Sequence, residues 1–135
     1  RGNPVGGCQI YLREEILMNF NELVLSEGVL ETLPEMLEEM FKKAYRAASY
    51  FMLVLDEEGE LRIVEEVSSN TTPGDVWNGK AVVVASENGF SPNRFEWDGE
   101  PTDEEMDEHI YEVIETEWID TAMNEIENKA RQGWF

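Results

Sequence analysis

The sequence predicts an α+β fold with N-terminal helices, a three- to four-stranded, mostly antiparallel sheet, and a long acidic C-terminal helical segment. Apolar residues recur at helical spacing near both ends of the chain, whereas the middle holds short apolar runs separated by turn residues. With 135 residues, 41% of them hydrophobic, the chain has enough apolar content to bury one core. We therefore expect residues 1–135 to form a single domain.

The N-terminal third is predicted to be helical after an irregular, glycine-rich segment at residues 1–9. Apolar residues at positions 12, 16, 20 and 23 predict a first helix over 10–25. Thr32 and Glu35 have the spacing of a capping box, and Pro34 between them suits the first turn of a helix. A second helix is therefore expected to begin at Thr32. Its apolar face would carry Leu33, Leu37, Met40, Phe41, Ala44 and Ala48.

The middle of the chain is predicted to form the sheet. Residues 50–67 predict a β-hairpin, because an apolar run is followed by turn residues at 56–59 and by a mixed strand from Leu61. A second apolar run at 81–85 predicts another strand. Both apolar strands are expected in the centre of the sheet, and the charged strand of the hairpin at an edge. Pro92 predicts that an edge strand or an extended loop follows.

Residues 102–131 are predicted to be helical, and a second capping box, Thr102 with Glu105, marks the start. At 100° per residue the apolar positions fall on two roughly opposite faces. The first face carries Met106, Ile110, Val113 and Ile114, and the second carries Trp118, Ile119, Ala122, Met123, Ile126 and Ala130. One straight helix cannot bury both faces against one core. We expect either a kink near 115–117 or a second surface, such as a homodimer contact through Trp118, Met123 and Ile126.

The chain is strongly acidic, with 30 Asp and Glu residues against 10 Lys and Arg and a formal net charge of −20. Fourteen of the acids, and no Lys or Arg, lie between Phe95 and Lys129. The apolar residues threaded through this stretch indicate a folded helix, because a self-solvating acidic tail lacks them. Such a surface repels nucleic acid and anionic membranes and attracts a basic partner. Adaptation to high salt or selection for solubility would produce a similar charge.

The acids of this helix are the predicted partner-binding residues. Residues four apart on a helix lie about 6 Å apart along its axis, a spacing comparable to that of phosphates along a nucleic-acid strand. The predicted row consists of Asp103, Glu104, Asp107, Glu108, Glu112 and Glu115, with Trp97 as a nearby aromatic anchor. A solvated helix face is the plainer interpretation of the same pattern.

His109 is the only histidine, and Glu105 and Glu112 would flank it on a helix. One histidine among carboxylates could serve acid–base chemistry or ligate a metal, so a small metal-dependent or acid–base hydrolase is one alternative. A metal site would more usually recruit a second His or Cys, and none is placed to help. Residues 74–80 fit the start of a phosphate-binding loop, but Ala81 replaces the Ser or Thr that holds magnesium. We therefore expect no metal and no cofactor.

Cys8 is the only cysteine, so no intrachain disulfide can form and a reducing compartment is favoured. No run approaches the roughly 18 apolar residues of a membrane span, and no segment is typical of a signal peptide. We therefore expect a cytoplasmic protein.

These observations predict a non-enzymatic acidic binding protein that occupies a basic site on a partner protein and does not bind nucleic acid directly. Its most concrete form is a nucleic-acid mimic, of the kind that phages and mobile elements use against host nucleases or other DNA-binding proteins. Two further alternatives stay open. One is an immunity or antitoxin-like protein that neutralises a basic toxin through aromatic anchors such as Trp77 and Trp97. The other is a structural component of a larger assembly.

Overall fold

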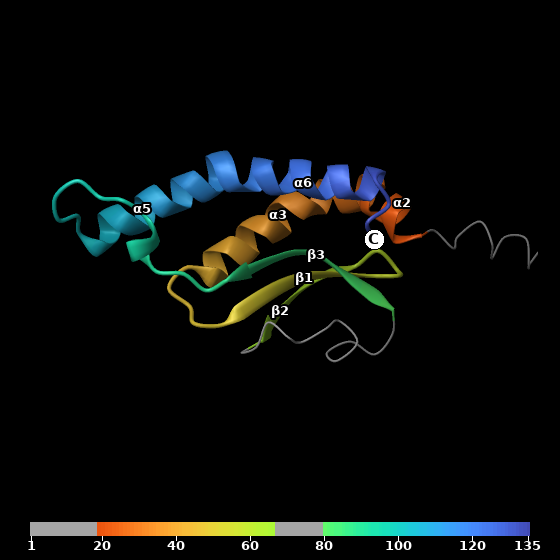
Figure 1. Ribbon diagram of the computed structural model, residues 1–135, viewed down its shortest axis with the longest axis horizontal. Helices are drawn as coiled ribbons and strands as arrows, with labels where there is room; N and C mark the ends of the chain where they lie inside the picture. The colour runs from red at the N-terminus through yellow and green to blue at the C-terminus, as the bar shows by residue number, and fades with distance from the viewer. Residues whose placement is uncertain (1–18, 67–79) are drawn as a thin grey trace, which may run out of the picture.

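Three strands form one antiparallel sheet, and helices cover one of its faces (Figure 1). The computed structural model describes residues 19–66 and 80–135. In chain order the elements are α2 (Phe20–Val24), α3 (Glu27–Ala44), β1 (Tyr50–Asp56), β2 (Leu61–Glu66), β3 (Ala81–Asn88), the 3₁₀-helix η1 (Pro92–Arg94), α5 (Asp103–Val113), the π-helix η2 (Ile114–Trp118) and α6 (Ile119–Arg131). This arrangement confirms the predicted α+β fold. The segment 1–9 and most of the helix predicted over 10–25 lie outside the described residues.

The strand order is β2-β1-β3, so β1 lies in the centre and pairs antiparallel with both neighbours. The predicted hairpin is confirmed. The expectation that both apolar strands are central was wrong for 81–85, because β3 is an edge strand of the described sheet. The apolar side chains of β3 that pack against the hydrophobic core lie beneath α6. A register shift opposite Leu53 and Val54 leaves Val84 without a facing residue, which is a β-bulge.

Helix α3 begins at Glu27, before the predicted capping box, so the predicted start at Thr32 was wrong. The Thr32 hydroxyl instead donates to the carbonyl of Gly28 at 2.9 Å, and Pro34 lies inside the helix. A proline there removes one backbone hydrogen bond. The apolar stripe compensates, because burying each large side chain contributes about 1.5–3 kcal/mol. Fully buried members of that stripe are Leu33, Leu37 and Met40.

After β3 the chain forms the short 3₁₀-helix η1 and then a loop that runs to Thr102. Of the edge strand or extended loop predicted after Pro92, the structure therefore has a loop, preceded by one helical turn. The side chain of Ser91 accepts a hydrogen bond from the backbone N–H of Asn93 at 3.3 Å. Pro92 occupies the start of the helical turn, where its missing N–H and fixed φ are no disadvantage. The turn directs the chain toward the start of α5.

The capping box predicted at the start of α5 is confirmed. The Glu105 N–H donates to the Thr102 hydroxyl at 3.2 Å, and the Thr102 N–H donates to the Glu105 carboxylate at 2.9 Å. The second bond lowers the pKa of the Glu105 carboxyl, because it favours the ionised form. Two of the free N–H groups at this helix end are therefore satisfied within the chain.

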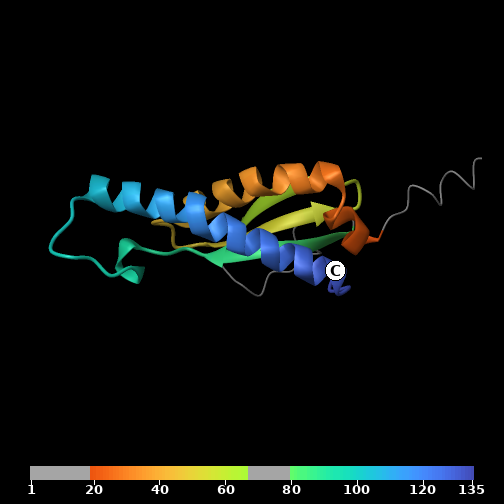
Figure 2. The ribbon, with the colours of Figure 1, turned by 90° about the horizontal axis from the view of Figure 1, so that it is seen from above.

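The π-helix η2 changes the face that α6 presents to the sheet. A turn with i→i+5 hydrogen bonds holds about one residue more than an α-turn, so the residues after it are set back by roughly 100°. Ile114 at the start of the wide turn and Ile126 after it are therefore buried in the same core. At the place where a kink was one of the two expectations, near 115–117, the structure has a π-helix within a continuous helical rod that crosses the sheet (Figure 2).

The second half of the closing helix packs on its own chain. Ile126 is 2% exposed, and Met123 is partly buried against the core. The Trp118 ring lies 5.4 Å from the Phe41 ring and 5.2 Å from the Phe90 ring. The change of face is thus explained within one chain, which removes the reason for expecting a homodimer through Trp118, Met123 and Ile126.

Helix α3 lies over β1 and β2, and α6 crosses over β3, so the core fills the space between two helices and one sheet face (Figure 2). The fully buried side chains of this core include Leu33, Leu37, Met40, Leu53, Leu55, Ile110 and Ile114. This packing fixes α5, η2 and α6 relative to the sheet, and it positions the surfaces described next.

Candidate partner-binding surfaces

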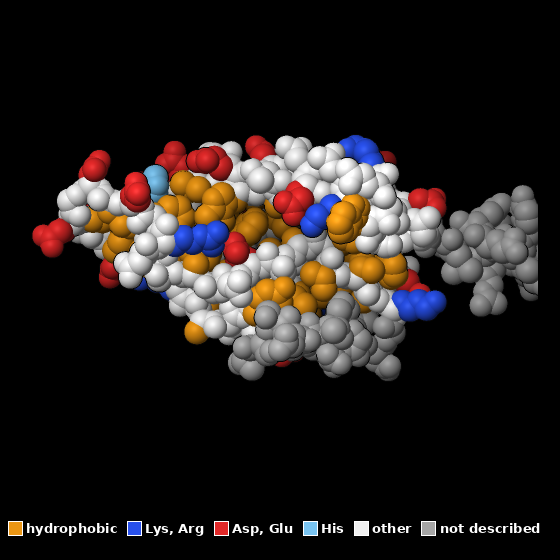
Figure 3. Space-filling view, in the orientation of Figure 1, with side chains coloured by type: hydrophobic (Ala, Val, Ile, Leu, Met, Phe, Trp, Pro, Cys, Tyr) orange, Lys and Arg blue, Asp and Glu red, His pale blue; other side chains and the backbone are white. Residues whose placement is uncertain are grey.

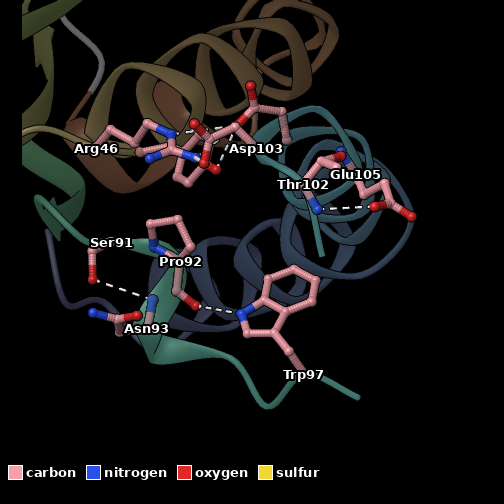
Figure 4. Close-up of polar contacts among 10 residues, drawn as sticks. Arg46, Ser91, Pro92, Asn93, Trp97, Thr102, Asp103 and Glu105 are labelled. Carbon is pink, nitrogen blue, oxygen red and sulfur yellow. Dashed lines mark hydrogen bonds and ion pairs between the residues drawn. The ribbon is translucent and has the colours of Figure 1, made fainter. Parts of the chain in front are cut away.

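Two of the predicted partner-binding acids are engaged inside the chain. Asp107 accepts a hydrogen bond of 2.6 Å from the Tyr45 hydroxyl, and the Arg46 guanidinium lies 3.3 Å from the same carboxylate. Arg46 also lies 3.5 Å from Asp103, as the close-up shows (Figure 4). These bonds tie the end of α3 to the first turns of α5. We call Tyr45, Arg46, Asp103 and Asp107 the α3–α5 clamp.

The backbone at the clamp has an unusual conformation. Arg46 has φ of 65°, in the left-handed region that residues other than glycine seldom adopt. Its N–H donates to the carbonyl of Phe90 at 2.6 Å, and Tyr45 forms an isolated parallel bridge with the same residue. These contacts hold the turn, and they aim the Arg46 side chain at α5. Burial and the hydrogen bond to Asp107 raise the pKa of Tyr45 to about 12.

A third predicted acid, Glu115, is also paired. Lys42 lies 3.1 Å from Glu115 and 2.7 Å from Glu38, so it joins α3 to η2. The Lys42 ammonium also lies 4.9 Å from the centre of the Tyr111 ring, on the same side of the helix. The hydrogen bond from Lys42 to Glu38 raises the pKa of the lysine. Glu115 therefore serves this chain's own packing.

The other three predicted acids form a separate row. Glu104, Glu108 and Glu112 are exposed, and none of them makes an ion pair with another described residue. They are four residues apart along α5, so they line one face over about 12 Å. We call these three residues the outer row. The structure thus divides the single row expected from the sequence into acids that pair with Arg46 or Lys42 and acids that have no ion pair among the described residues.

Trp97, the predicted aromatic anchor, belongs to an internal aromatic cluster. Its indole N–H donates to the carbonyl of Pro92 at 2.9 Å, and its side chain is partly buried (Figure 4). Its ring packs edge-on against the His109 ring, with ring centres 5.3 Å apart. The centre of the Phe95 ring lies 6.1 Å from the centre of the Trp97 ring. Trp77, the other anchor considered, lies outside the described residues.

His109 is exposed on α5 and lies against the rings of Trp97 and Phe95. Of the two acids expected to flank it, Glu105 is engaged in the capping box. In the part of the chain that the structure describes, no three His, Cys, Asp or Glu side chains are grouped so that they could hold a metal ion. The histidine therefore stands beside aromatic rings and not within a converging set of acids.

A groove between β3 and the closing helix was missed by sequence reasoning. Its volume is about 670 Å³, and its apolar floor is formed by Phe41, Val84, Trp118, Ala122 and Ile126. Apolar side chains are visible at the bottom of this hollow, with charged side chains along its edges (Figure 3). The sequence carries no sign of the groove, because its two walls are far apart along the chain and only strand pairing shows that β3 is at an edge.

Charged residues form the two rims of this groove. On the strand side Arg94 lies 3.4 Å from Glu87, and its guanidinium stacks 5.0 Å from the centre of the Trp118 ring. On the helix side Lys129 lies 3.2 Å from Glu125. Glu117, on the same helical side, is exposed and makes no ion pair with another described residue. The groove therefore combines an apolar floor with rims that carry one more acid than bases.

Comparison with protein-family models, with curated proteins and with solved structures finds no match for this chain. Among the described helices, none is long and apolar enough to cross a membrane.

Proposed function

We propose that this protein is a non-enzymatic binding protein whose acidic surface occupies a basic site on a partner protein. The outer row carries the proposal: three exposed carboxylates along one face of α5, without an ion-pair partner in the described residues. Like charges four apart on a helix oppose its formation by a few tenths of a kcal/mol per pair. The position of Glu104 in the first turn of α5 offsets part of this cost, and a cationic partner would offset the repulsion that remains along the row.

The rigidity of α5 supports the same proposal. The capping box fixes its first turn, and the α3–α5 clamp fixes its orientation on the domain. The outer row is thus presented in one geometry before a partner arrives, and little conformational entropy is lost on binding. The net charge of −20 adds long-range attraction, which raises the rate of encounter with a basic protein at low salt.

The finer form of the proposal is a nucleic-acid mimic. Carboxylates spaced by about 6 Å along a straight helix offer a basic groove a substitute for successive phosphates. A protein built to bind phosphates gains affinity by releasing counterions, and the same gain is available from a fixed row of carboxylates. The partner would then be a nuclease or another nucleic-acid-binding protein, and nucleic acid would compete for the same site.

The test replaces the outer row and compares it with an equivalent row elsewhere. The variant Glu104→Lys, Glu108→Lys, Glu112→Lys reverses three charges on α5. The control reverses three exposed glutamates with the same spacing on α3, namely Glu27, Glu31 and Glu35. Capture from a cell lysate at low salt, with identification of the bound protein, supplies the partner for affinity measurements.

The outer-row variant is expected to lose at least about tenfold in affinity, and the α3 control much less, since three specific contacts are removed in one case only. Affinity of the unmodified protein should fall steeply between low and high salt. Equal losses for both variants would mean that only bulk charge matters, and salt-independent binding would refute the proposal. Competition by a DNA duplex decides whether the mimic form is correct.

A further inference from the structure

Among the described residues, the edge of the sheet at β3 carries backbone groups that pair with no second strand. β3 hydrogen-bonds only to β1 in the described sheet, so half of its N–H and C=O groups point away from any strand. Within residues 19–66 and 80–135, none of these groups bonds to a residue outside that sheet. An open strand edge is a ready template for another extended chain, and proteins usually cover it or charge it.

The groove lies along this edge. Its floor is formed by the apolar face of η2 and α6, with Trp118, Ala122 and Ile126, and by Val84 at the bulge of β3. A strand added to β3 would lie about 4.8 Å from it, and its alternate side chains would point toward the helix and away from it. One set of side chains would therefore enter the apolar floor while the backbone continues the sheet. The volume of about 670 Å³ falls in the range of ligand-binding clefts.

The charge of the groove rims indicates which kind of peptide segment the groove would bind. Glu87 is paired with Arg94 and Glu125 with Lys129, which leaves Glu117 on the rim without an ion pair among the described residues. The formal charge of the whole chain, −20, adds a negative field around the groove. A second copy of this chain would bring an equal negative charge and its own Glu87 to the same edge. A basic segment is therefore favoured over self-pairing.

We propose that the β3–α6 groove binds an extended, basic segment of a partner protein, which adds as a fourth strand to β3 and inserts alternate apolar side chains between the strand and α6. Backbone hydrogen bonds would supply affinity, and the groove floor and Glu117 would supply specificity. This site is separate from the outer row on α5, so it does not rest on the function proposed above.

The experiment uses the whole chain and a defined probe, a heptapeptide of alternating lysine and valine with blocked ends. One control peptide is N-methylated at alternate residues, which removes the donors needed for strand pairing, and another replaces lysine by glutamate. Ala122→Phe fills the groove floor, and Asn124→Phe places the same side chain on an exposed position of α6 outside the groove. Glu117→Gln removes the unpaired rim charge, and Glu31→Gln removes an exposed charge on α3 as its matched control.

The basic heptapeptide is expected to bind and to shift the backbone amide resonances of β3. Ala122→Phe should lower the affinity for the basic heptapeptide by at least about tenfold, and Asn124→Phe should leave that affinity unchanged. Glu117→Gln should weaken binding of the basic heptapeptide severalfold more than Glu31→Gln. N-methylation should abolish binding. Equal binding of the N-methylated peptide, tight binding of the acidic peptide, or no effect of Ala122→Phe would each overturn the proposal. It would also be overturned if sedimentation showed a dimer that Ala122→Phe dissociates.

Discussion

Replacing Asp107 by alanine is expected to destabilise the fold, whereas replacing its neighbour Glu108 is not. The two acids are adjacent on α5 and would be treated alike on charge alone. The structure separates them, because Asp107 accepts a 2.6 Å hydrogen bond from Tyr45 and faces Arg46, whereas Glu108 belongs to the exposed outer row. This pair of substitutions tests the division of the acids on which the proposed function depends.

The magnitude follows from the bonds that are lost. A hydrogen bond to a charged group contributes about 1.5–3 kcal/mol, and the side chain of Asp107 is 43% exposed, which favours the lower half of that range. The exposed pair with Arg46 adds little. Alanine is the better helix former by roughly 0.5 kcal/mol, which offsets part of the loss. We expect Asp107→Ala to cost about 1.5 kcal/mol, and Glu108→Ala to be neutral or to stabilise by a few tenths of a kcal/mol.

Urea unfolding followed by circular dichroism measures both values, with thermal unfolding as a second measure. For a domain of this size 1 kcal/mol corresponds to a change in Tm of about 4 °C. A double-mutant cycle of Asp107→Ala with Tyr45→Phe isolates the hydrogen bond and should give a coupling free energy of about 1.5–2 kcal/mol. Equal effects of the two alanine substitutions, or a coupling near zero, would refute the clamp and the division of the acids.

Four other substitutions test local features of the fold. Thr102→Ala should cost about 1 kcal/mol in urea unfolding, because it removes one side of the capping box. Gly89→Ala should cost about 2 kcal/mol or more, since its Cβ would collide with the carbonyl of Ala47, whereas Gly28→Ala in open space should stabilise α3 slightly. The pKa of Tyr45, raised to about 12, keeps that residue protonated in the folded state; its contribution to stability is therefore present below pH 10 and lost by about pH 12. In Tyr45→Phe the free energy of unfolding should therefore change less between about pH 10 and pH 12 than it does in the unmodified protein.

The elements that sequence predicted well are those set by local pattern. The capping box at Thr102 and the hairpin over 50–67 depend on residues close in the chain, and both are confirmed. The break near 115–117 was also predictable, because the two apolar faces of the closing helix could not meet one core. Its form as a π-helix depends on how α6 meets α3 and β3, which local pattern does not contain.

The predictions that were wrong depended on tertiary contacts. The capping-box spacing at Thr32 gave the wrong start for α3, because burial of its apolar stripe extends the helix through Pro34. The site was predicted in part: the sequence located the acids of α5, but only the structure shows which of them Arg46 and Lys42 neutralise. The groove at β3 could not be predicted, because the edge of a sheet is decided by pairing.

The wide turn at η2 also sets where the closing helix can change length. Deleting one residue within Ile114–Trp118 would convert the π-turn into an ordinary α-turn and leave both flanks on the faces they now occupy. A deletion elsewhere in α5 or α6 would rotate everything downstream by about 100° and turn Ile126 away from the core. A single-residue deletion should therefore be tolerated at this one turn of the closing helix and not elsewhere in it.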